Sequence, residues 1–494
     1  MAGIGFELKS LFEKEGILPK FRAYGYASLV STGPMILGVT LLLGIMYLAT
    51  LNGATRIERE LLVSMITYAL LASLVTSGVL STIITRYLAD MLYSGRKEAV
   101  MPSFYGVNMV NLFFGGIFYG AFLWNSGVAR SYQLISFLFF LTLVVVWTEM
   151  TYLTALKDYK QVMLTFLWAV LAVMVLGYFL VRYSSMDTTT SLLLSVWTGY
   201  GIMCLRYFSL LYQYFPEGSG TSLNFLRWIE KYPSLFFLST FINLGLFGHL
   251  VIMWNSPLEI LVQGAFHGSP TYDVAALVAI FSILLTTVNF VSAVEVRFYP
   301  IYKDYFSLFN YGGNIQDIDN TEKNMLRVLS SELSHLAFKQ VIVTILFISV
   351  GTIVLPRTSL GFNSDMLGIY RMLCIGYALY AIGNSLMMIM LYFEDNVGAS
   401  VSAFLFAFLT NGFTLLFREW DSIYYGLGFI IGSAVFCIVC YIRMDWFINH
   451  LRYQVLSKKP IFVIEKGGIF TYLCNWLERK SKKKQRQFRK KTLQ

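Results

Sequence analysis

The chain has 494 residues, of which 56% are hydrophobic and only 13% are charged, with a formal net charge of +10. Soluble globular domains carry roughly 25% charged residues, and water could not solvate a surface built from this mixture. The composition therefore excludes a soluble globular protein and indicates a helical bundle in lipid.

Twelve runs are long enough to cross a membrane, which requires roughly 20 mostly apolar residues. Strands are not expected, because a membrane barrel has short alternating segments rather than long continuous apolar runs. The fold class predicted is therefore an all-α polytopic membrane protein with about twelve transmembrane helices. The predicted spans are residues 26–51, 60–85, 102–124, 133–155, 161–181, 190–211, 235–254, 273–296, 338–355, 366–392, 397–417 and 423–442.

The placement of basic residues predicts the orientation. With the N-terminus inside, only seven of the 38 Lys and Arg residues fall on the outer side, and all 19 lysines lie on the cytoplasmic side. Cytoplasmic loops carry the excess of basic residues in membrane proteins. We therefore expect both termini to be cytoplasmic.

Four regions follow from this layout. Residues 1–22 carry an apolar stripe, which fits either a short amphipathic helix lying in the interface or an ordinary first turn packed on the bundle. A cytoplasmic loop at 212–234 falls midway among the spans, so it divides an N-lobe (23–232, spans 1–6) from a C-lobe (233–445, spans 7–12). Residues 446–494 form a basic cytoplasmic tail.

A second long cytoplasmic loop covers about 297–337. Its segment Tyr311–Asn314, with two glycines, is typical of a turn. Asn320 is expected to cap a short helix that runs to about Phe338.

The tail concentrates positive charge in eight Lys and Arg residues between 480 and 491. Such a segment is attracted to anionic membrane lipids, by on the order of 1 kcal/mol per charge. The alternative is a docking surface for a cytoplasmic partner. Nucleic-acid binding is not expected from a tail held at the membrane surface.

The first span contains Pro34, which follows Ser31 and Thr32. Proline removes a backbone hydrogen bond, and broken helices often line transport sites, although a simple structural kink is the alternative. The second span carries a polar stripe that includes Ser77 and Ser81. This stripe fits either the wall of a water-filled path or close helix packing through small residues.

The tenth span places Tyr370, Tyr377, Tyr380 and Asn384 on one face. Aromatic rings offer flat surfaces for sugar rings, and hydroxyl and amide groups can replace water at sugar hydroxyls. The stripe suits a sugar-lined conduit, and its alternative is amphipathic aromatic packing.

The eighth span carries Ser282, Thr286 and Asn289 on one face, and the seventh span contains Asn243. Glu295 follows in the eighth span, where a buried charge would be costly, so it is expected to face water or a partner such as Arg297 or Arg206.

Three further charges are candidates for coupling or gating. Glu149 lies in the fourth span. For both Glu295 and Glu149, the alternative to a position deep in the span is one near the cytoplasmic surface. Arg86 and Asp90 are four residues apart and should pair at the inner face.

Catalytic, cofactor and metal motifs are not evident in the sequence. Cys437 and Cys440 form a C-x-x-C, but it lies inside an apolar span, so we interpret it as core packing. No two of the four histidines are at metal-ligand spacing, and we find neither a P-loop nor a nucleophile elbow. We therefore expect a protein that is not an enzyme and carries no cofactor.

The segments Met1–Leu8, Arg22–Pro34 and Thr85–Asp90 resemble the PelG family, the inner-membrane transporters of the Pel exopolysaccharide system. The resemblance extends over the whole chain in length, span count and loop layout, and is specific mainly in the first 100 residues. It implies a relative of the multidrug, oligosaccharidyl-lipid and polysaccharide exporter superfamily, in which two six-helix lobes face each other across a central cavity.

That fold implies a substrate path near residues of the first, second, seventh and eighth helices: Ser31, Thr32, Pro34, Ser77, Ser81, Asn243, Thr286 and Asn289. The resemblance implies export of a galactosamine-rich polysaccharide across the bacterial cytoplasmic (inner) membrane, in support of a biofilm matrix. The implied partners are a cytoplasmic processive glycosyltransferase and other Pel membrane subunits, including the cyclic-di-GMP receptor. The alternatives are a cation-coupled flippase for a lipid-linked oligosaccharide or small molecule, and a membrane anchor for the glycosyltransferase.

Overall fold

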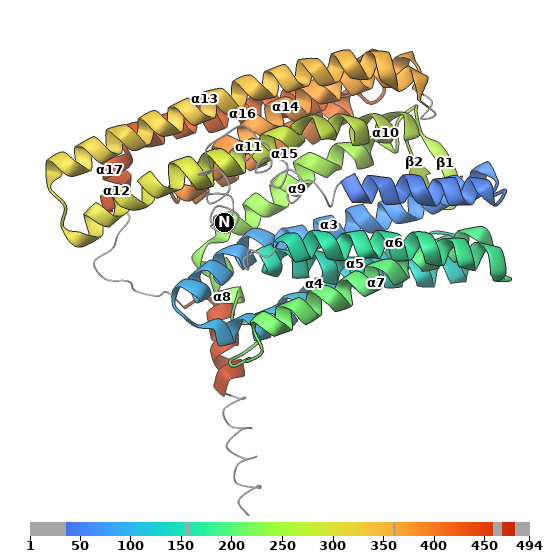
Figure 1. Cartoon of the computed structure of the whole chain (residues 1–494), viewed down its shortest axis with the longest axis horizontal. Coiled ribbons are helices and arrows are strands. Elements are labelled where there is room, and N and C mark those ends of the chain that lie inside the picture. The colour runs from blue at the N-terminus through green and yellow to red at the C-terminus, as the bar shows by residue number, and fades with distance from the viewer. Residues whose placement is uncertain (1–35, 155–158, 359–361, 458–466, 480–494) are drawn as a thin grey trace, which may run out of the picture. The chain divides into compact units, whose positions relative to one another are not determined.

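The computed structural model describes the chain except for residues 1–35, 155–158, 359–361, 458–466 and 480–494 (Figure 1). Ten described helices are long and apolar enough to cross a membrane. Together with the shorter helix Ile36–Leu51 and with α7, they place a helix at every predicted span. The all-α polytopic prediction is therefore confirmed.

The chain forms two compact units, which divide within α9 (Pro233–Met253) after Asn243. The N-unit comprises Leu37–Asn243, Val262–Phe266 and the end of the chain from Ser457. Its other helices are Ile36–Leu51, α3 (Arg56–Tyr93), η1 (Lys97–Ala99), α4 (Val100–Trp124), α5 (Arg130–Thr154), α6 (Tyr159–Tyr183), α7 (Thr188–Tyr214), α8 (Leu226–Lys231) and a tail helix at 469–479.

The C-unit comprises Leu244–Leu261 and His267–Leu456. Its helices after α9 are α10 (Pro270–Ala279), η2 (Ile280–Ile283), α11 (Leu284–Val291), η3 (Ser292–Phe298), α12 (Tyr299–Tyr311), α13 (Ile315–Val354), η4 (Leu355–Arg357), α14 (Ser364–Tyr392), α15 (Asn396–Phe417), η5 (Ser422–Tyr424), α16 (Leu427–Asn449) and α17 (Leu451–Ser457).

The predicted short helix that begins at Asn320 is wrong. The cap is Asn314, whose side chain accepts a hydrogen bond from the Gln316 amide, and α13 then continues for 40 residues to Val354. Such a helix is about 60 Å long, twice the thickness of the hydrocarbon core. The turn before it is as predicted, because Gly312 ends α12 at a positive φ of 79°.

A small hairpin was not expected from the sequence. Strands β1 (Ile260–Gln263) and β2 (Phe266–Gly268) form a two-stranded sheet outside the apolar runs. The turn approaches the loop between α4 and α5, where the Ala265 amide donates to the Ser126 carbonyl at 2.8 Å. Gly264 has a positive φ of 59°, and a Cβ there would lie 1.9 Å from the Ser126 oxygen, so only glycine fits.

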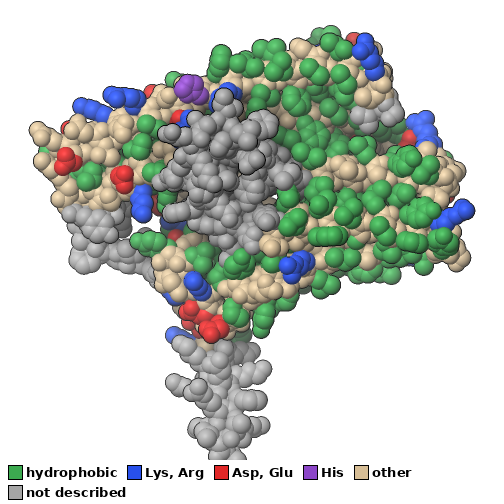
Figure 2. All heavy atoms as spheres, in the orientation of Figure 1, with side chains coloured by type: hydrophobic (Ala, Val, Ile, Leu, Met, Phe, Trp, Pro, Cys, Tyr) green, Lys and Arg blue, Asp and Glu red, His purple; other side chains and the backbone are tan. Residues whose placement is uncertain are grey.

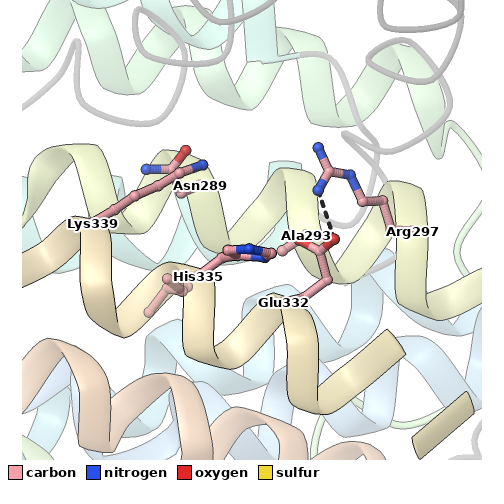
Figure 3. Close-up of a pocket in the computed structure, with 7 residues that line it drawn as sticks. Asn289, Ala293, Arg297, Glu332, His335 and Lys339 are labelled. Carbon is pink, nitrogen blue, oxygen red and sulfur yellow. Dashed lines mark hydrogen bonds and ion pairs between the residues drawn. The ribbon is translucent and has the colours of Figure 1, made fainter. Parts of the chain in front are cut away.

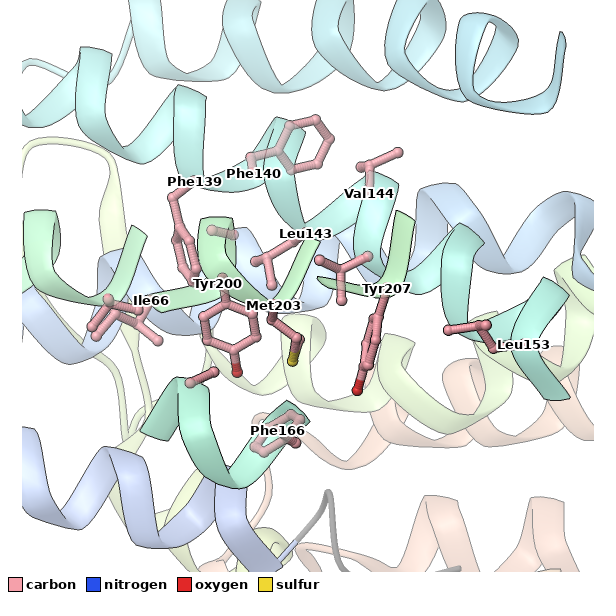
Figure 4. Close-up of a cluster of buried hydrophobic side chains, with 14 of the residues drawn as sticks. Ile66, Phe139, Phe140, Leu143, Val144, Leu153, Phe166, Tyr200, Met203 and Tyr207 are labelled. Carbon is pink, nitrogen blue, oxygen red and sulfur yellow. The ribbon is translucent and has the colours of Figure 1, made fainter. Parts of the chain in front are cut away.

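The core of the N-unit is built from large apolar side chains of α5 and α7 (Figure 4). Phe139 and Leu143 of α5 face Tyr200 and Met203 of α7, and all four are buried. The outward side chains are also apolar: Phe118, Trp168 and Phe408 are each more than 60% exposed. Figure 2 shows hydrophobic side chains covering broad areas of the visible surface, as expected for a surface in contact with lipid.

In the C-unit, α15 and α16 approach closely through glycine. Gly428 and Gly432 are one helical turn apart on α16, and they lie against Thr414 and Thr410 of α15. A Cβ at Gly432 would lie 2.7 Å from the backbone nitrogen of Thr410. This small-residue contact is the usual way in which membrane helices bring their backbones together.

Candidate functional site

The eighth predicted span is the most irregular part of the described membrane helices. Between α10 and α12 the backbone passes through a 3₁₀ segment at Ile280–Ile283 and a π-helical segment at Ser292–Phe298. Each departure from α geometry changes which carbonyls find a partner within the helix. In lipid, a freed carbonyl must be satisfied by a neighbouring side chain or by water.

Gln340 of α13 provides this partner. Its side chain is fully buried, and its Nε2 donates to the Ser282 carbonyl at 3.3 Å and to Thr344 Oγ1 at 2.9 Å. Its Oε1 accepts a hydrogen bond from the Thr286 hydroxyl. A polar layer therefore joins the irregular span to α13 within the C-unit, where apolar side chains would otherwise meet.

A small pocket lies between the same two elements and is lined by residues of both (Figure 3). It is a shallow depression open to solvent, with a cavity volume of about 10 Å³, enough for roughly one water molecule. The buried Asn289 lies at one end, and Arg297 forms an ion pair with Glu332 at 2.6 Å. His335 and Lys339 line the side formed by α13. With the histidine neutral, the pocket carries a net charge of +1.

The charge of this pocket favours neutral or negatively charged groups over cations, because its one carboxylate is already paired. The pair itself contributes little to stability, because Arg297 is half exposed and solvent screens the attraction. The amide of Asn289 can both donate and accept hydrogen bonds, which suits sugar hydroxyls. The side chain of Glu295 lies outside the described residues, so its expected pairing with Arg297 stays a prediction. Arg297 itself pairs with Glu332.

The polar stripe of α3 lies in the N-unit and bonds mainly within its own helix. Ser77 Oγ donates to the Ser73 carbonyl, and Ser81 Oγ donates to the Gly78 carbonyl. Gly78 faces α9 closely, since a Cβ there would lie 2.5 Å from Asn243 Nδ2. Close packing through small residues thus accounts for this part of the stripe. A role for Ser77, Ser81 and Asn243 in a substrate path stays a prediction.

The predicted pairing of Arg86 with Asp90 is confirmed, and its location at the inner face stays a prediction. Arg86 and Asp90 of α3 form an ion pair at 3.3 Å. Asp90 also accepts a hydrogen bond from Trp228 Nε1 at 2.7 Å, and the Arg86 guanidinium lies 5.1 Å from the ring centre of Tyr232. These contacts hold α8 against the C-terminal end of α3. The helix α8 lies in the predicted loop between the two lobes.

Glu149 is fully buried in α5. Its Oε1 accepts a weak hydrogen bond from the Cys204 thiol at 3.8 Å. Its Oε2 has no hydrogen-bond partner among the described residues. Burying a carboxyl group without a full set of partners is costly, so its position inside the span calls for a functional or structural role.

The tyrosine face of the tenth predicted span lies on α14 and is buried. The Tyr377 ring packs 4.8 Å from Phe429 and the Tyr380 ring packs 5.3 Å from Phe406, measured between ring centres. Asn384 is half-buried on the same helix. These rings are therefore engaged in aromatic packing in this conformation, and their part in a conduit stays a prediction.

Ser31, Thr32, Pro34 and the helix expected in residues 1–22 lie outside the described residues. Of the polar layer, Gln340 and Thr344 were not singled out by sequence reasoning. The available signal was a glutamine in an apolar run, the third residue of the predicted ninth span at 338–355.

Solved structures with a similar fold are transporters. A multidrug resistance MATE family transporter of the MOP superfamily, in an outward-facing conformation, matches with a TM-score of 0.60 at 12% identity, over 90% of this chain and 98% of that chain. A MOP superfamily transporter from Pyrococcus furiosus matches with a TM-score of 0.57 at 11% identity, over 86% and 96%. A MATE structure in the bent conformation matches with a TM-score of 0.58 at 12% identity, over 92% and 100%.

The chain therefore has the fold of the MATE-type transporters of the MOP superfamily. Sequence comparison with curated proteins finds no match. The family described as "PelG: Putative exopolysaccharide Exporter (EPS-E)" matches residues 1–456. The chain belongs to this PelG family of multi-pass membrane exporters, so family and fold are those of transporters rather than enzymes.

Proposed function

We propose that this protein exports Pel-type exopolysaccharide, a galactosamine-rich polymer, across the bacterial cytoplasmic membrane for the biofilm matrix. The family match over residues 1–456 is the observation that carries the proposal. The pocket of the C-unit supports it, because the Asn289 amide and the Lys339 ammonium that line it can hydrogen-bond to sugar hydroxyls.

The same proposal places both termini in the cytoplasm, on the basis of the 19 lysines assigned to that side. Its partners would be the processive glycosyltransferase that builds the polymer and other Pel membrane subunits, including the cyclic-di-GMP receptor. Synthesis at the cytoplasmic side would push the growing polymer toward the transporter. We infer that Asn289 contacts the polymer, because it belongs to the irregular span and lines the pocket.

The test locates the polymer. The glycosyltransferase is expressed with the wild-type chain, without the chain, and with Asn289→Leu or the control Asn108→Leu, and hexosamine polymer is measured inside and outside the cells. Asn108 matches Asn289 in burial, and its side chain bonds to the Phe104 carbonyl of its own helix at 3.1 Å. We expect polymer to stay inside without the chain and to leave poorly with Asn289→Leu, whereas Asn108→Leu should export normally.

Polymer outside cells that lack the chain would overturn the exporter assignment. Synthesis that fails altogether without the chain, while Asn289→Leu has no effect, would support a membrane anchor for the glycosyltransferase instead. Equal membrane levels of the two variants, measured by blotting, separate a transport defect from loss of protein.

A cation-coupled flippase is a second candidate, favoured by the buried carboxyl group of Glu149. Glu149→Gln keeps the shape and removes the proton site. If coupling passes through this residue, export by the variant should become independent of an imposed pH gradient. Export that keeps its response to the gradient would exclude Glu149, and the same comparison with Glu295→Gln would test the residue first suggested by the sequence.

A further inference from the structure

The tail helix at 469–479 is held against α8 by its polar side. Arg227 of α8 donates to Asn475 Oδ1 and to Glu478 Oε1, both at 2.9 Å. The Cys474 thiol donates to the Leu223 carbonyl at 3.2 Å. These residues of the tail helix recur at helical spacing, so one whole face is used for docking.

Glu230 fixes the beginning of the same helix. Its carboxylate accepts hydrogen bonds from the backbone amides of Phe470 and Thr471 and from the Thr471 hydroxyl at 2.6 Å. Burial acts to raise the pKa of Glu230, but these hydrogen bonds outweigh it and hold the pKa below its ordinary value. The carboxylate is therefore charged at neutral pH and caps the helix N-terminus.

The opposite face of the tail helix is apolar and points away from α8. Ile469 is 84% exposed, Tyr472 is 76% exposed and Trp476 is 50% exposed. Leu473 completes this face at 37% exposure. A helix that docks only to give protein contacts would bury its apolar face and expose its polar one. Here the polar residues hydrogen-bond to α8 and to the loop before it, with Cys474 buried among them, and the apolar residues are exposed.

The direction of the helix and the charge that follows it identify the partner. Figure 1 shows the red tail helix beside α8, running across the direction of α4 and α7 rather than along it. A helix across the spans at their cytoplasmic end runs parallel to the membrane surface. Tyrosine and tryptophan are the side chains enriched at that interface. In the sequence, the eight Lys and Arg residues between 480 and 491 begin directly after the helix.

We propose that the tail helix is an interfacial anchor, whose face Ile469–Tyr472–Leu473–Trp476 docks on the cytoplasmic leaflet while the basic residues after it bind anionic lipid headgroups. An apolar face with a following basic cluster is the combination that gives stable surface binding, because either signal alone is weak. Since the helix is bonded to α8, the anchor would fix the linker between spans 6 and 7 to the bilayer surface. This role does not depend on which substrate is exported.

The test uses the full chain in nanodiscs, with a coumarin amino acid at position 472 and nitroxide-labelled lipid as quencher. The control label replaces Ile315, which is also apolar and 72% exposed. It lies at the start of α13, about 35 Å along the helix from Phe338, where the predicted span begins. We expect strong lipid quenching at 472 and little at 315, and stronger quenching at 472 in discs with anionic phosphatidylglycerol than in phosphatidylcholine alone.

Neutralising two lysines should weaken the anchor measurably. A basic residue near an anionic surface changes the equilibrium constant roughly fivefold, so Lys483→Gln with Lys484→Gln should lower the bound-to-free ratio roughly 30-fold in anionic discs. Quenching at 472 no greater than at 315 would overturn the proposal. Quenching unaffected by lipid charge and by the double variant would overturn the anionic part. Protection of the label only when the glycosyltransferase is added would make the face a protein-docking surface instead.

Discussion

Replacing Gln340 by leucine should destabilise the C-unit, because it removes the polar partner of the irregular eighth span. Leucine keeps a similar volume, so the change acts mainly through hydrogen bonds. Three side-chain bonds are lost, to the Ser282 carbonyl, the Thr344 hydroxyl and the Thr286 hydroxyl. Thr344 retains its bond to the backbone carbonyl of residue 340 at 2.8 Å.

The expected cost follows from these three bonds. Hydrogen bonds between membrane helices average about 0.6 kcal/mol each, so the loss is about 2 kcal/mol. The Ser282 carbonyl makes the largest demand, because it belongs to the 3₁₀ segment and is buried. A change of this size should lower the midpoint of thermal unfolding by a few degrees.

The assay is thermal unfolding of purified protein in one detergent, followed by tryptophan fluorescence and by loss of the monodisperse peak. Ser385→Ala is the control, because Ser385 is also buried but its hydroxyl bonds to the Ala381 carbonyl of its own helix. We expect the control to stay within about 1 °C of wild type, since an intrahelical hydroxyl bond adds little. A Gln340→Leu protein as stable as wild type would refute the reasoning that this side chain satisfies the irregular backbone.

Three other outcomes follow from packing and charge. Gly432→Ala should cost about 1–3 kcal/mol by forcing α15 and α16 apart, whereas Gly412→Ala, where no atom lies within 4 Å of the new Cβ, should leave thermal stability unchanged. Because the folded-state pKa of Glu230 is lowered, its support of the tail helix is present above the ordinary pKa and lost as pH falls through the lowered value. A nitroxide at Leu473 should therefore gain mobility only in that acidic range, and constant mobility there would contradict the capping role. Glu149→Gln should match or exceed the wild-type unfolding midpoint, because it removes an ionisable group from a fully buried site, and a clear fall would show that the carboxyl group is needed there.

Sequence reasoning was most successful where the property is local. The length and apolarity of each run predicted where helices form, and the i,i+4 spacing of Arg86 and Asp90 predicted their ion pair. It was least successful at element ends. Asn320 and Asn314 are both plausible caps in sequence, and only the φ of Gly312 and the continuity of α13 decide between them.

The candidate site was predicted in part. Thr286 and Asn289 stood out as polar residues in an apolar run, but Gln340, the partner of Thr286, lies 54 positions later in the chain. No local pattern indicates which two helix faces meet at that separation. For the same reason, the sequence left Tyr377 open to a conduit or a packing role, and the Phe429 ring beside it became apparent only in the structure.

The sequence by itself determined that this protein is a polytopic membrane protein and where its apolar helices fall, because hydrophobic length acts on each segment independently. Only the tertiary structure showed which polar groups hydrogen-bond to one another and where the eighth span departs from α geometry. It also showed that the apolar face of the tail helix points away from α8. Those features depend on contacts between segments far apart in the chain, and apolar packing tolerates many such pairings. The hydrogen bonds that select among them form only when the helices are assembled.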